Sequence, residues 1–460
     1  MTGLLLLILA AGIVAVSFSK IEKSVFYAVA TTLLVVSFYP SFTVGAVNTA
    51  LSLAGLVVLL TISTLRAIAS RLKPKFSPGI FCFIFFVIIT SIANSVGGDQ
   101  DRVSIMLVQG LMIILLSLTS SYFQPAYRNK LILLFALVMV VQFIVTTGEQ
   151  FFGTGALWPR VNGTDIIENR PNSFTDILVG RSLGTMSMMI TLGAFCGFSI
   201  LLFSQRFLDS NRKMKFFWFS LIIVSGVVIF FSGTRSAVVA LIIATLAWLI
   251  TGLRSLAAQL LLLVGGSAAM IVILQIDIVA LLGFSNFENT ESFEHRFGVI
   301  TSVTTILNNP TGLLFGRGGV GATDLLVNSL GGTDGLTSYD NMYVRELAVS
   351  GLLGFSLLVS FLVRSFFSGD KLSKILMIYL CAMGMSFDQF TWRVIFVLFA
   401  LTVAGVFRKT TEENSDVTEG EDPVILNDDK MVLMPNTKIG IDSVIDYESN
   451  KFVKKKLFSK

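Results

Sequence analysis

Runs of about 20 apolar residues recur along this chain, and each is long enough to cross a bilayer as a helix. Hydrophobic residues make up 54% of the 460 residues, and charged residues only 14%. Soluble domains carry about 25% charged residues, so a chain this poor in charge would not cover a water-exposed surface. The strand alternation of an outer-membrane barrel is absent. The sequence therefore excludes a cytosolic enzyme and predicts an all-α, polytopic transmembrane helical bundle.

We expect 13 membrane-spanning helices, within a range of about 12 to 14. Their predicted bounds are 2–19, 24–41, 44–65, 78–96, 103–119, 130–147, 183–204, 215–232, 236–252, 256–283, 342–363, 374–388 and 394–407. The first apolar run has neither a positive segment before it nor a cleavage site after it, so we interpret it as a span.

Three regions are expected along the chain. Residues 1–182 hold the N-terminal spans and a first long outer loop, and residues 183–409 form the core transmembrane domain. Within the core lies a second long outer loop, 284–340, in which apolar residues between Phe293 and Leu307 recur at helical spacing. The expected helix ends at Asn308-Asn309-Pro310-Thr311-Gly312. Residues 410–460 have the composition of a disordered cytoplasmic tail.

The distribution of basic residues predicts the orientation. Every lysine falls in alternate loops on one side or in the tail, which makes that side cytoplasmic and puts the N-terminus outside. The outer side carries arginines and no lysine. Because the arginine guanidinium offers a planar, bidentate donor suited to phosphate, we expect at least two of these arginines to bind anions. The alternative is that they only cap helices structurally.

Several kinds of site are not indicated. Three cysteines lie inside apolar runs without a C-x-x-C pair, and there is one histidine, His295, so neither a disulfide framework nor a metal site is expected. The Gly316-Arg317-Gly318-Gly319-Val320-Gly321 segment is like a phosphate loop in its glycines, but it has no Gly-Lys-Ser/Thr ending. We therefore expect no metal, no cofactor, no nucleotide and no nucleic-acid partner.

Four short segments carry the strongest functional signal. They are Gly180-Arg181-Ser182-Leu183-Gly184-Thr185, Ser232-Gly233-Thr234-Arg235-Ser236-Ala237, His295-Arg296 with the following Asn309-Pro310-Thr311-Gly312 and Gly316-Arg317-Gly318, and Tyr339-Asp340-Asn341-Met342-Tyr343 with Glu346 and Gly351. In order and spacing they resemble the O-antigen ligase and polymerase superfamily of bacterial polysaccharide assembly. The resemblance covers about residues 180–365.

The resemblance implies a metal-independent integral membrane glycosyltransferase. Such an enzyme lies in the bacterial inner membrane, with its active site on the outer face, among membrane lipid. It takes a glycan from undecaprenyl diphosphate and transfers it to an acceptor hydroxyl. For a polymerase the acceptor is another lipid-linked repeat, and a chain-length regulator protein is an implied partner. For a ligase the acceptor is the lipid A core.

The resemblance and the residue chemistry together nominate the site residues. The expected catalytic residues are Asp340, Arg235, Arg296 and Glu346, and the expected diphosphate- and glycan-binding residues are Arg181, Arg235, Arg296, Arg317, Asn341 and Arg345. Arg235 sits at a predicted helix N-terminus, where the dipole favours anions. Asp340 would accept the proton of the acceptor hydroxyl.

Each of these assignments has a structural alternative. Arg235 would then snorkel from a helix end, Arg296 would pair with the acids before it, and Asp340 would be the N-cap of the eleventh span. Arg345 and Glu346 would form a packing pair. Asp388 and Arg393 are interpreted as a structural pair.

One departure from the family separates its two activities. Ligases usually carry a histidine before the asparagine that corresponds to Asn341, and here that residue is Asp340. This difference favours polymerase over ligase. A lipid-linked glycan flippase or secondary transporter is the third hypothesis, and it would place essential charges near the bilayer midplane in broken spans.

Overall fold

The computed structural model describes residues 2–38, 46–71, 78–154, 157, 180–186, 188–252, 299, 302–329, 339–387 and 392–408. In these ranges all regular structure is helical, with 13 helices of seven or more residues and no strand. The all-α prediction is therefore confirmed. The predicted span 256–283, Arg296, Asp388 and the tail 410–460 lie outside the described residues. The described helices belong to one compact unit, Met1–Lys409.

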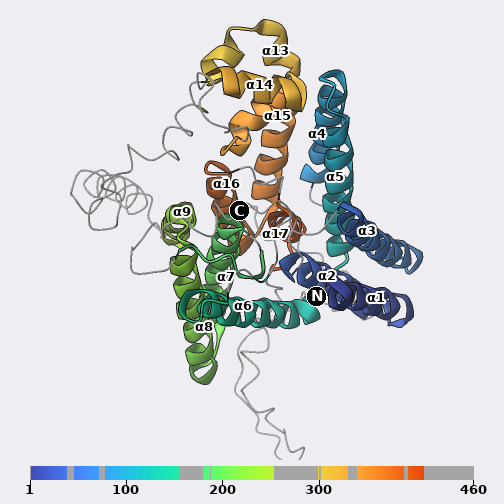
Figure 1. The fold of residues 1–460 in the computed structure, drawn as a ribbon. Helices are drawn as coiled ribbons and strands as arrows, with labels where there is room; N and C mark the ends of the chain where they lie inside the picture. Colours follow the sequence, from blue (N-terminus) through green and yellow to red (C-terminus); the bar gives the residue numbers. More distant parts are fainter. Residues whose placement is uncertain are drawn as a thin grey trace, which may run out of the picture. The chain divides into compact units, whose positions relative to one another are not determined.

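The helices follow the apolar runs closely (Figure 1). They are α1 (Thr2–Phe18), α2 (Ile21–Phe38), α3 (Ala46–Ala69), α4 (Gly79–Val96), α5 (Gln100–Ser121), η1 (Pro125–Tyr127), α6 (Arg128–Phe151), η3 (Gly184–Met186), α7 (Met189–Asp209), α8 (Arg212–Ser232), α9 (Arg235–Gly252), α13 (Pro310–Phe315), α14 (Gly318–Ser329), α15 (Met342–Ser368), α16 (Lys371–Gly384) and α17 (Arg393–Val403). Every predicted span except 256–283 overlaps one of them.

Seven of the described helices are long and apolar enough to cross a membrane. They lie within α2, α3, α4, α7, α8 and α15 and in the continuous stretch Pro125–Phe151 that contains α6. By helix length and hydropathy the chain is a multi-pass membrane protein. The larger predicted number of spans also counts helices outside these seven, such as α1, α5, α9, α16 and α17, and for these membrane crossing stays a prediction.

The predicted functional segments meet at one set of helix ends. Hydrogen bonds join the C-terminal end of α2 to the segment before α7, and the N-terminus of α15 to the end of α16. These are Thr185 Oγ1 to the Ser37 carbonyl, 2.6 Å, and Asn341 Nδ2 to the Met385 carbonyl, 3.2 Å. We call this the motif end: the C-terminal ends of α2, α4, α6, α8 and α16 and the N-terminal ends of α7, α9 and α15.

The opposite helix ends carry the lysines, and we call them the lysine end. The lysines of the described segments lie near the N-termini of α2, α6, α8 and α16. Three of them lie over aromatic rings, in the pairs Lys130–Tyr127, Lys215–Phe207 and Lys374–Phe366. Long lysine stems that pack on apolar rings while the ammonium group reaches outward are typical of helix ends at a membrane surface.

The eleventh predicted span is interrupted, which the sequence did not indicate. Within α15, Gly351 has a φ of 64° and a ψ of −169°, so the helix breaks there. The backbone of Gly316 packs against the break, and a Cβ on Gly351 would collide with the Gly316 nitrogen. Gly316 itself has a φ of 80°, and a Cβ there would collide with the Val349 carbonyl. Both positions therefore require glycine.

Contacts between α4 and α15 show which part of α4 lies beside the first residues of α15. A Cβ on Gly79, at the start of α4, would lie 2.9 Å from the Phe361 carbonyl, and one on Gly354 would lie 3.7 Å from Ile89. Gly97, just after α4, lies against Arg317 and Gly318. The first residues of α15 are therefore level with the end of α4, well away from its middle.

A second, small hydrophobic core lies beside the N-terminal part of α15. It consists of Val299, Ile306, Ala322, Leu325, Leu326, Tyr339, Ala348 and Val349. The predicted stop of the loop helix is correct, since the helical turn ends at Asn308. Asn309 then starts a new helix, because its side chain accepts the Gly312 N–H at 3.0 Å and Pro310 occupies the first turn of α13. The glycines from Gly318 onward belong to α14, so the expected glycine-rich turn shrinks to Gly316 and Arg317.

Candidate functional site

The first part of the site is the segment Gly180–Met186, which we call the lead segment because it precedes α7. Our prediction that the span begins at residue 183 is wrong: α7 begins at Met189. The Glu149 carboxylate of α6 accepts the backbone N–H groups of Leu183, 3.0 Å, and Gly184, 3.1 Å. Gly184 has a φ of 57°. These bonds satisfy backbone groups that a helix would otherwise satisfy.

Two glutamines of α6 hold the rest of the lead segment. Gln142 Oε1 accepts the Thr185 N–H at 2.9 Å, and Gln150 Nε2 donates to the Gly180 carbonyl, 2.9 Å, and to Ser182 Oγ, 2.8 Å. Both glutamines are buried, and burial of an amide is tolerated when it is hydrogen-bonded. Sequence reasoning missed these residues, although their i, i+7, i+8 spacing with Glu149 marks one polar face on an apolar span.

The lead segment is bonded to the junction of α8 and α9. The Ser182 N–H donates to the Phe231 carbonyl at 2.9 Å, and Thr234 Oγ1 donates to the Met189 carbonyl at 2.9 Å. Gly233, with a φ of 62°, ends α8 and lets the chain turn directly into α9. The structure thus brings together two of the four segments that the sequence singled out, 180–185 and 232–237.

Arg181 and Arg235 lie on these two joined segments. Arg181 is half-buried, and its Nη1 lies 3.3 Å from the Met189 sulfur, a weak acceptor. Arg235 is also half-buried and is the first residue of α9, as predicted. A guanidinium group at a helix N-terminus adds its charge to the partial positive charge of the helix dipole. Both predicted anion-binding arginines therefore lie near one junction.

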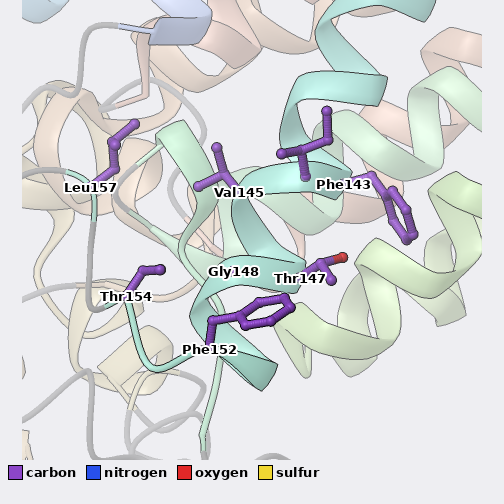
Figure 2. A pocket seen from close by; sticks show the side chains of 8 residues that line it. Phe143, Val145, Thr147, Gly148, Phe152, Thr154 and Leu157 are labelled. Atoms are coloured by element: carbon purple, nitrogen blue, oxygen red, sulfur yellow. The ribbon is translucent and has the colours of Figure 1, made fainter.

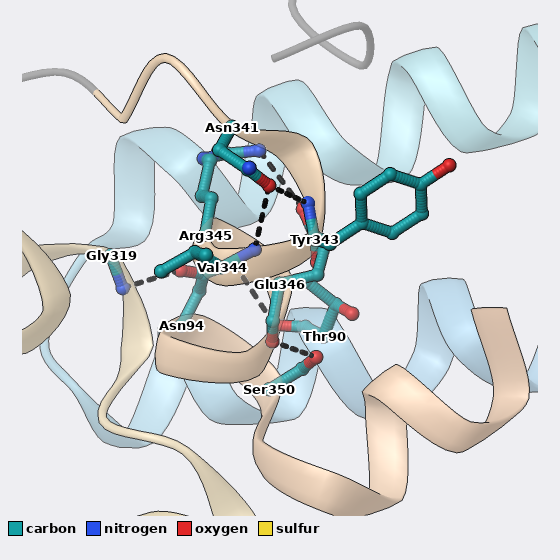
Figure 3. Close-up of polar contacts among 9 residues, drawn as sticks. All are labelled: Thr90, Asn94, Gly319, Asn341, Tyr343, Val344, Arg345, Glu346 and Ser350. Carbon is teal, nitrogen blue, oxygen red and sulfur yellow. Dashed lines mark hydrogen bonds and ion pairs between the residues drawn. The ribbon is translucent and has the colours of Figure 1, made fainter. Parts of the chain in front are cut away.

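The second part of the site is the start of α15 (Figure 3). The Asn341 side-chain oxygen accepts the N–H groups of Tyr343, 3.0 Å, and Val344, 3.1 Å. Asn341 is therefore the N-cap, and the capping alternative for Asp340 is wrong, because Asp340 lies one residue before the cap. The Asn341 amide also donates to Met385. This leaves one amide hydrogen of Asn341 for the substrate contact we predicted.

Arg345 and Glu346 form an ion pair, with 3.0 Å between Nη1 and Oε1 (Figure 3). The Glu346 side chain is 1% exposed and that of Arg345 is 16% exposed. A buried carboxylate needs such a partner, because desolvation of a lone charge costs several kcal/mol (roughly). The packing role that we gave as an alternative is thus real, and it coexists with any role at the substrate.

Tyr339 connects two of the predicted arginines. Its hydroxyl donates to the Ala322 carbonyl at 2.8 Å, in the small core. Burial raises the pKa of Tyr339 to about 12, while a hydrogen bond with Ser302 and the charges of Arg317 and Arg345 act in the lowering direction. The charges of Arg317 and Arg345 thus both act on the hydroxyl of a residue that our sequence prediction of the site omitted.

Arg317 is fixed by backbone contacts on both sides. Its N–H donates to the Ala348 carbonyl at 3.0 Å, and the next-but-one residue, Gly319, donates its N–H to Asn94 Oδ1 at 2.7 Å. Asn94 is 3% exposed near the end of α4 (Figure 3). An asparagine near the end of an apolar span was visible in the sequence, but its partner on α14 was not.

Helix α16 contacts both parts of the site. The Tyr379 hydroxyl donates to the Ala194 carbonyl of α7 at 3.0 Å, and Met385, the C-cap of α16, accepts from Asn341. Tyr379 is fully buried, and Gly197 leaves room for its ring. α16 therefore joins α7, which follows the lead segment, to the start of α15.

An apolar cavity lies on another face of α6 (Figure 2). Its volume is about 510 Å³, and it is lined by Phe143, Ile144, Val145, Thr147, Gly148, Phe152, Thr154 and Leu157. We call it the α6 groove. It begins one residue from Glu149, so it lies beside the residues that hold the lead segment.

In the parts of the chain that the structure describes, no three histidine, cysteine, aspartate or glutamate side chains gather as a metal site would require. The chemistry of the two parts instead rests on arginines, one buried ion pair and the half-buried Asp340. Comparison with known proteins adds no family: no protein-family model matches the chain, and no curated protein matches it.

Proposed function

We propose that this protein is a polysaccharide polymerase, which transfers a glycan from undecaprenyl diphosphate to a lipid-linked acceptor repeat. The observation that carries the proposal is the junction of the lead segment with the start of α9, where buried hydrogen bonds join the two segments that carry Arg181 and Arg235. A guanidinium group at the N-terminus of a helix, as Arg235 is, suits a diphosphate.

The proposed reaction is a single displacement. The acceptor hydroxyl oxygen attacks C1 of the donor sugar, the bond from C1 to the diphosphate oxygen breaks, and undecaprenyl diphosphate leaves. Asp340 takes the hydroxyl proton, and the arginines stabilise the negative charge of the leaving group. The N-cap of α15 is Asn341, so capping does not account for Asp340.

The level of the charged residues along the helices supports chemistry near a membrane surface. Arg345 and Glu346 lie level with the end of α4, and Arg235 begins α9 at the same set of helix ends. A transporter would be expected to place its essential charges near the middle of its spans.

One observation favours the transport alternative, a lipid-linked glycan flippase or secondary transporter. The break at Gly351 makes α15 a discontinuous span, which is the construction that transporters use for their substrate sites. The break, however, is filled by the backbone of Gly316, which closes it against a substrate.

A genetic test separates these functions. The gene is deleted in its native host and restored as wild type, as Arg235→Ala, or as Arg364→Ala, and surface glycans are examined on gels. Arg364 is an exposed arginine at the lysine end of α15 and serves as the matched control. We expect Arg235→Ala, at normal protein level, to leave single repeats without a ladder, and Arg364→Ala to restore the ladder.

Other outcomes would identify the alternatives. A bare lipid A core with accumulated lipid-linked polymer would identify a ligase, and loss of repeat units from the outer leaflet would identify a flippase. An unchanged glycan profile after deletion would refute all three functions.

A further inference from the structure

We propose that the α6 groove holds the isoprenoid chain of the lipid-linked donor. This inference rests on the proposed function and adds a binding site to it, for the hydrocarbon part of the substrate. The groove is lined by α6 residues that flank Glu149 and Gln150, which hold the lead segment.

The groove and the polar residues occupy different faces of α6. Phe143, Ile144, Thr147 and Gly148 are spaced i, i+1, i+4 and i+5, so they share one helical face. Gln142, Glu149 and Gln150, which bond to the lead segment, point to another side of the helix. One helix thus supports the arginine-bearing segment on one side and an apolar surface on the other.

The surroundings of the groove point to a hydrocarbon occupant. α6 lies in one of the seven candidate spans, and Ile144 and Phe152 are 62% and 78% exposed. Exposed apolar side chains on a spanning helix face lipid, and no water is available to fill an apolar groove there. The volume of about 510 Å³ falls in the usual range for small-molecule sites, so part of one chain fits.

The level of the groove selects which hydrocarbon it holds. Gly148 and Phe152 bracket Glu149 and Gln150, and Gln150 is bonded to the two residues that flank Arg181. A lipid in the groove therefore has its head at the level of Arg181. Because the proposed function assigns Arg181 to the diphosphate, the chain attached to that diphosphate is the one positioned to enter.

Gly148 offers a way to fill the groove. A Cβ at this position would lie 3.2 Å from Thr154 Oγ1, so a larger side chain must occupy the space between α6 and the following loop. Gly226, on α8, is exposed, and nothing lies within 4 Å of a Cβ there. Gly226→Leu is therefore the matched control for Gly148→Leu. Ile144→Trp, at the exposed rim, fills the groove from outside and serves if Gly148→Leu does not fold.

The experiment combines labelling with turnover, using the full chain in detergent with lipid. One probe is a photoreactive isoprenyl diphosphate, and a second is a phospholipid with a photoreactive acyl chain. We expect the isoprenyl probe to label the peptide that contains residues 143–157. Gly148→Leu or Ile144→Trp should reduce this labelling at least about tenfold, and Gly226→Leu should not. A tenfold loss of affinity corresponds to about two methylene groups of the isoprenoid chain that are no longer buried.

Turnover is measured with two donors that carry the same glycan diphosphate on a long or a two-unit isoprenoid chain. Wild type should have a lower KM for the long-chain donor, and the groove-filling variants should lose that preference while keeping kcat on the short-chain donor. Labelling elsewhere, equal labelling by the phospholipid probe, or an unchanged preference would overturn the groove proposal. Specific labelling without any turnover would instead refute the proposed function and leave the groove as an isoprenoid site.

Discussion

The carboxylate of Glu149, two residues before the end of α6, accepts the backbone N–H of Gly184 at 3.1 Å, across 35 residues of sequence. The same carboxylate accepts the N–H of Leu183. This relationship keeps the lead segment out of helix α7 and sets it against the α8–α9 junction, where Arg181 and Arg235 lie. The position of the proposed diphosphate site thus depends on an acid of another span.

Glu149→Ala should destabilise the protein more than Glu149→Gln. Alanine leaves two backbone N–H groups without this acceptor, a loss of about 1–3 kcal/mol when such groups are buried. Glutamine retains an acceptor oxygen. Thermal unfolding in detergent should show a clearly lower midpoint for Glu149→Ala. Equal midpoints for the two variants would mean that the carboxylate does not hold the lead segment.

Gly351→Ala should cost more stability than Gly405→Ala. Both glycines have positive φ, 64° and 68°, which L side chains rarely adopt. Gly351 also has a ψ of −169°, in a region that essentially only glycine occupies. Gly351 lacks room for a Cβ as well, because the Gly316 backbone lies against it, whereas nothing lies within 4 Å at Gly405. The difference in unfolding midpoint between the two variants therefore measures the strain and the packing at the break together, and no difference would contradict both.

Asn341→Ala should destabilise α15, and Asn341→Asp should not. The lost cap costs about 0.5–2 kcal/mol, whereas aspartate accepts the same N–H groups and suits the helix dipole. The readout is the unfolding midpoint of each variant. If Asn341→Asp is as unstable as Asn341→Ala, the bond to Met385 is the more important contact of this side chain.

Asp340→Asn should lower turnover while the protein stays folded. As the proposed proton acceptor, Asp340 accounts for about 10²–10⁴ in rate, and asparagine keeps its size without its basicity. Turnover is compared with that of Arg364→Ala, the exposed control at the lysine end of α15. Full activity of Asp340→Asn would remove this residue from the proposed mechanism.

Tyr339 predicts loss of stability at high pH. Its pKa is raised by burial from 10.0 to about 12, so the folded state holds the proton more tightly than the unfolded state. The stabilisation is fully present below pH 10 and is lost as the pH rises toward 12, by about 2–3 kcal/mol in all. Unfolding midpoints measured between pH 9 and 12 should fall more steeply for wild type than for Tyr339→Phe. If the unfolding midpoints of wild type and Tyr339→Phe fall equally with pH, ionisation of Tyr339 does not cause the loss of stability.

The sequence by itself determined where the helices lie. Apolar runs are local, and a chain segment that must satisfy its own backbone groups in lipid has little choice but a helix. The sequence also showed the lysines at one set of helix ends and the four segments that carry the candidate residues. Both features depend only on residues that are close together in the sequence. The start of α9 at Arg235 followed from local signals alone.

The tertiary structure decided the departures from this pattern, and each has a distant cause. α7 begins late because Glu149, Gln142 and Gln150 of α6 take the backbone bonds of the lead segment. α15 breaks because the Gly316 backbone packs at Gly351. Arg317 lies against α15, with its N–H on the Ala348 carbonyl, because the small core that holds Tyr339 packs on that helix. Hydrogen bonds and close contacts between remote segments outweigh local helix preference at these places, and no local pattern encodes them.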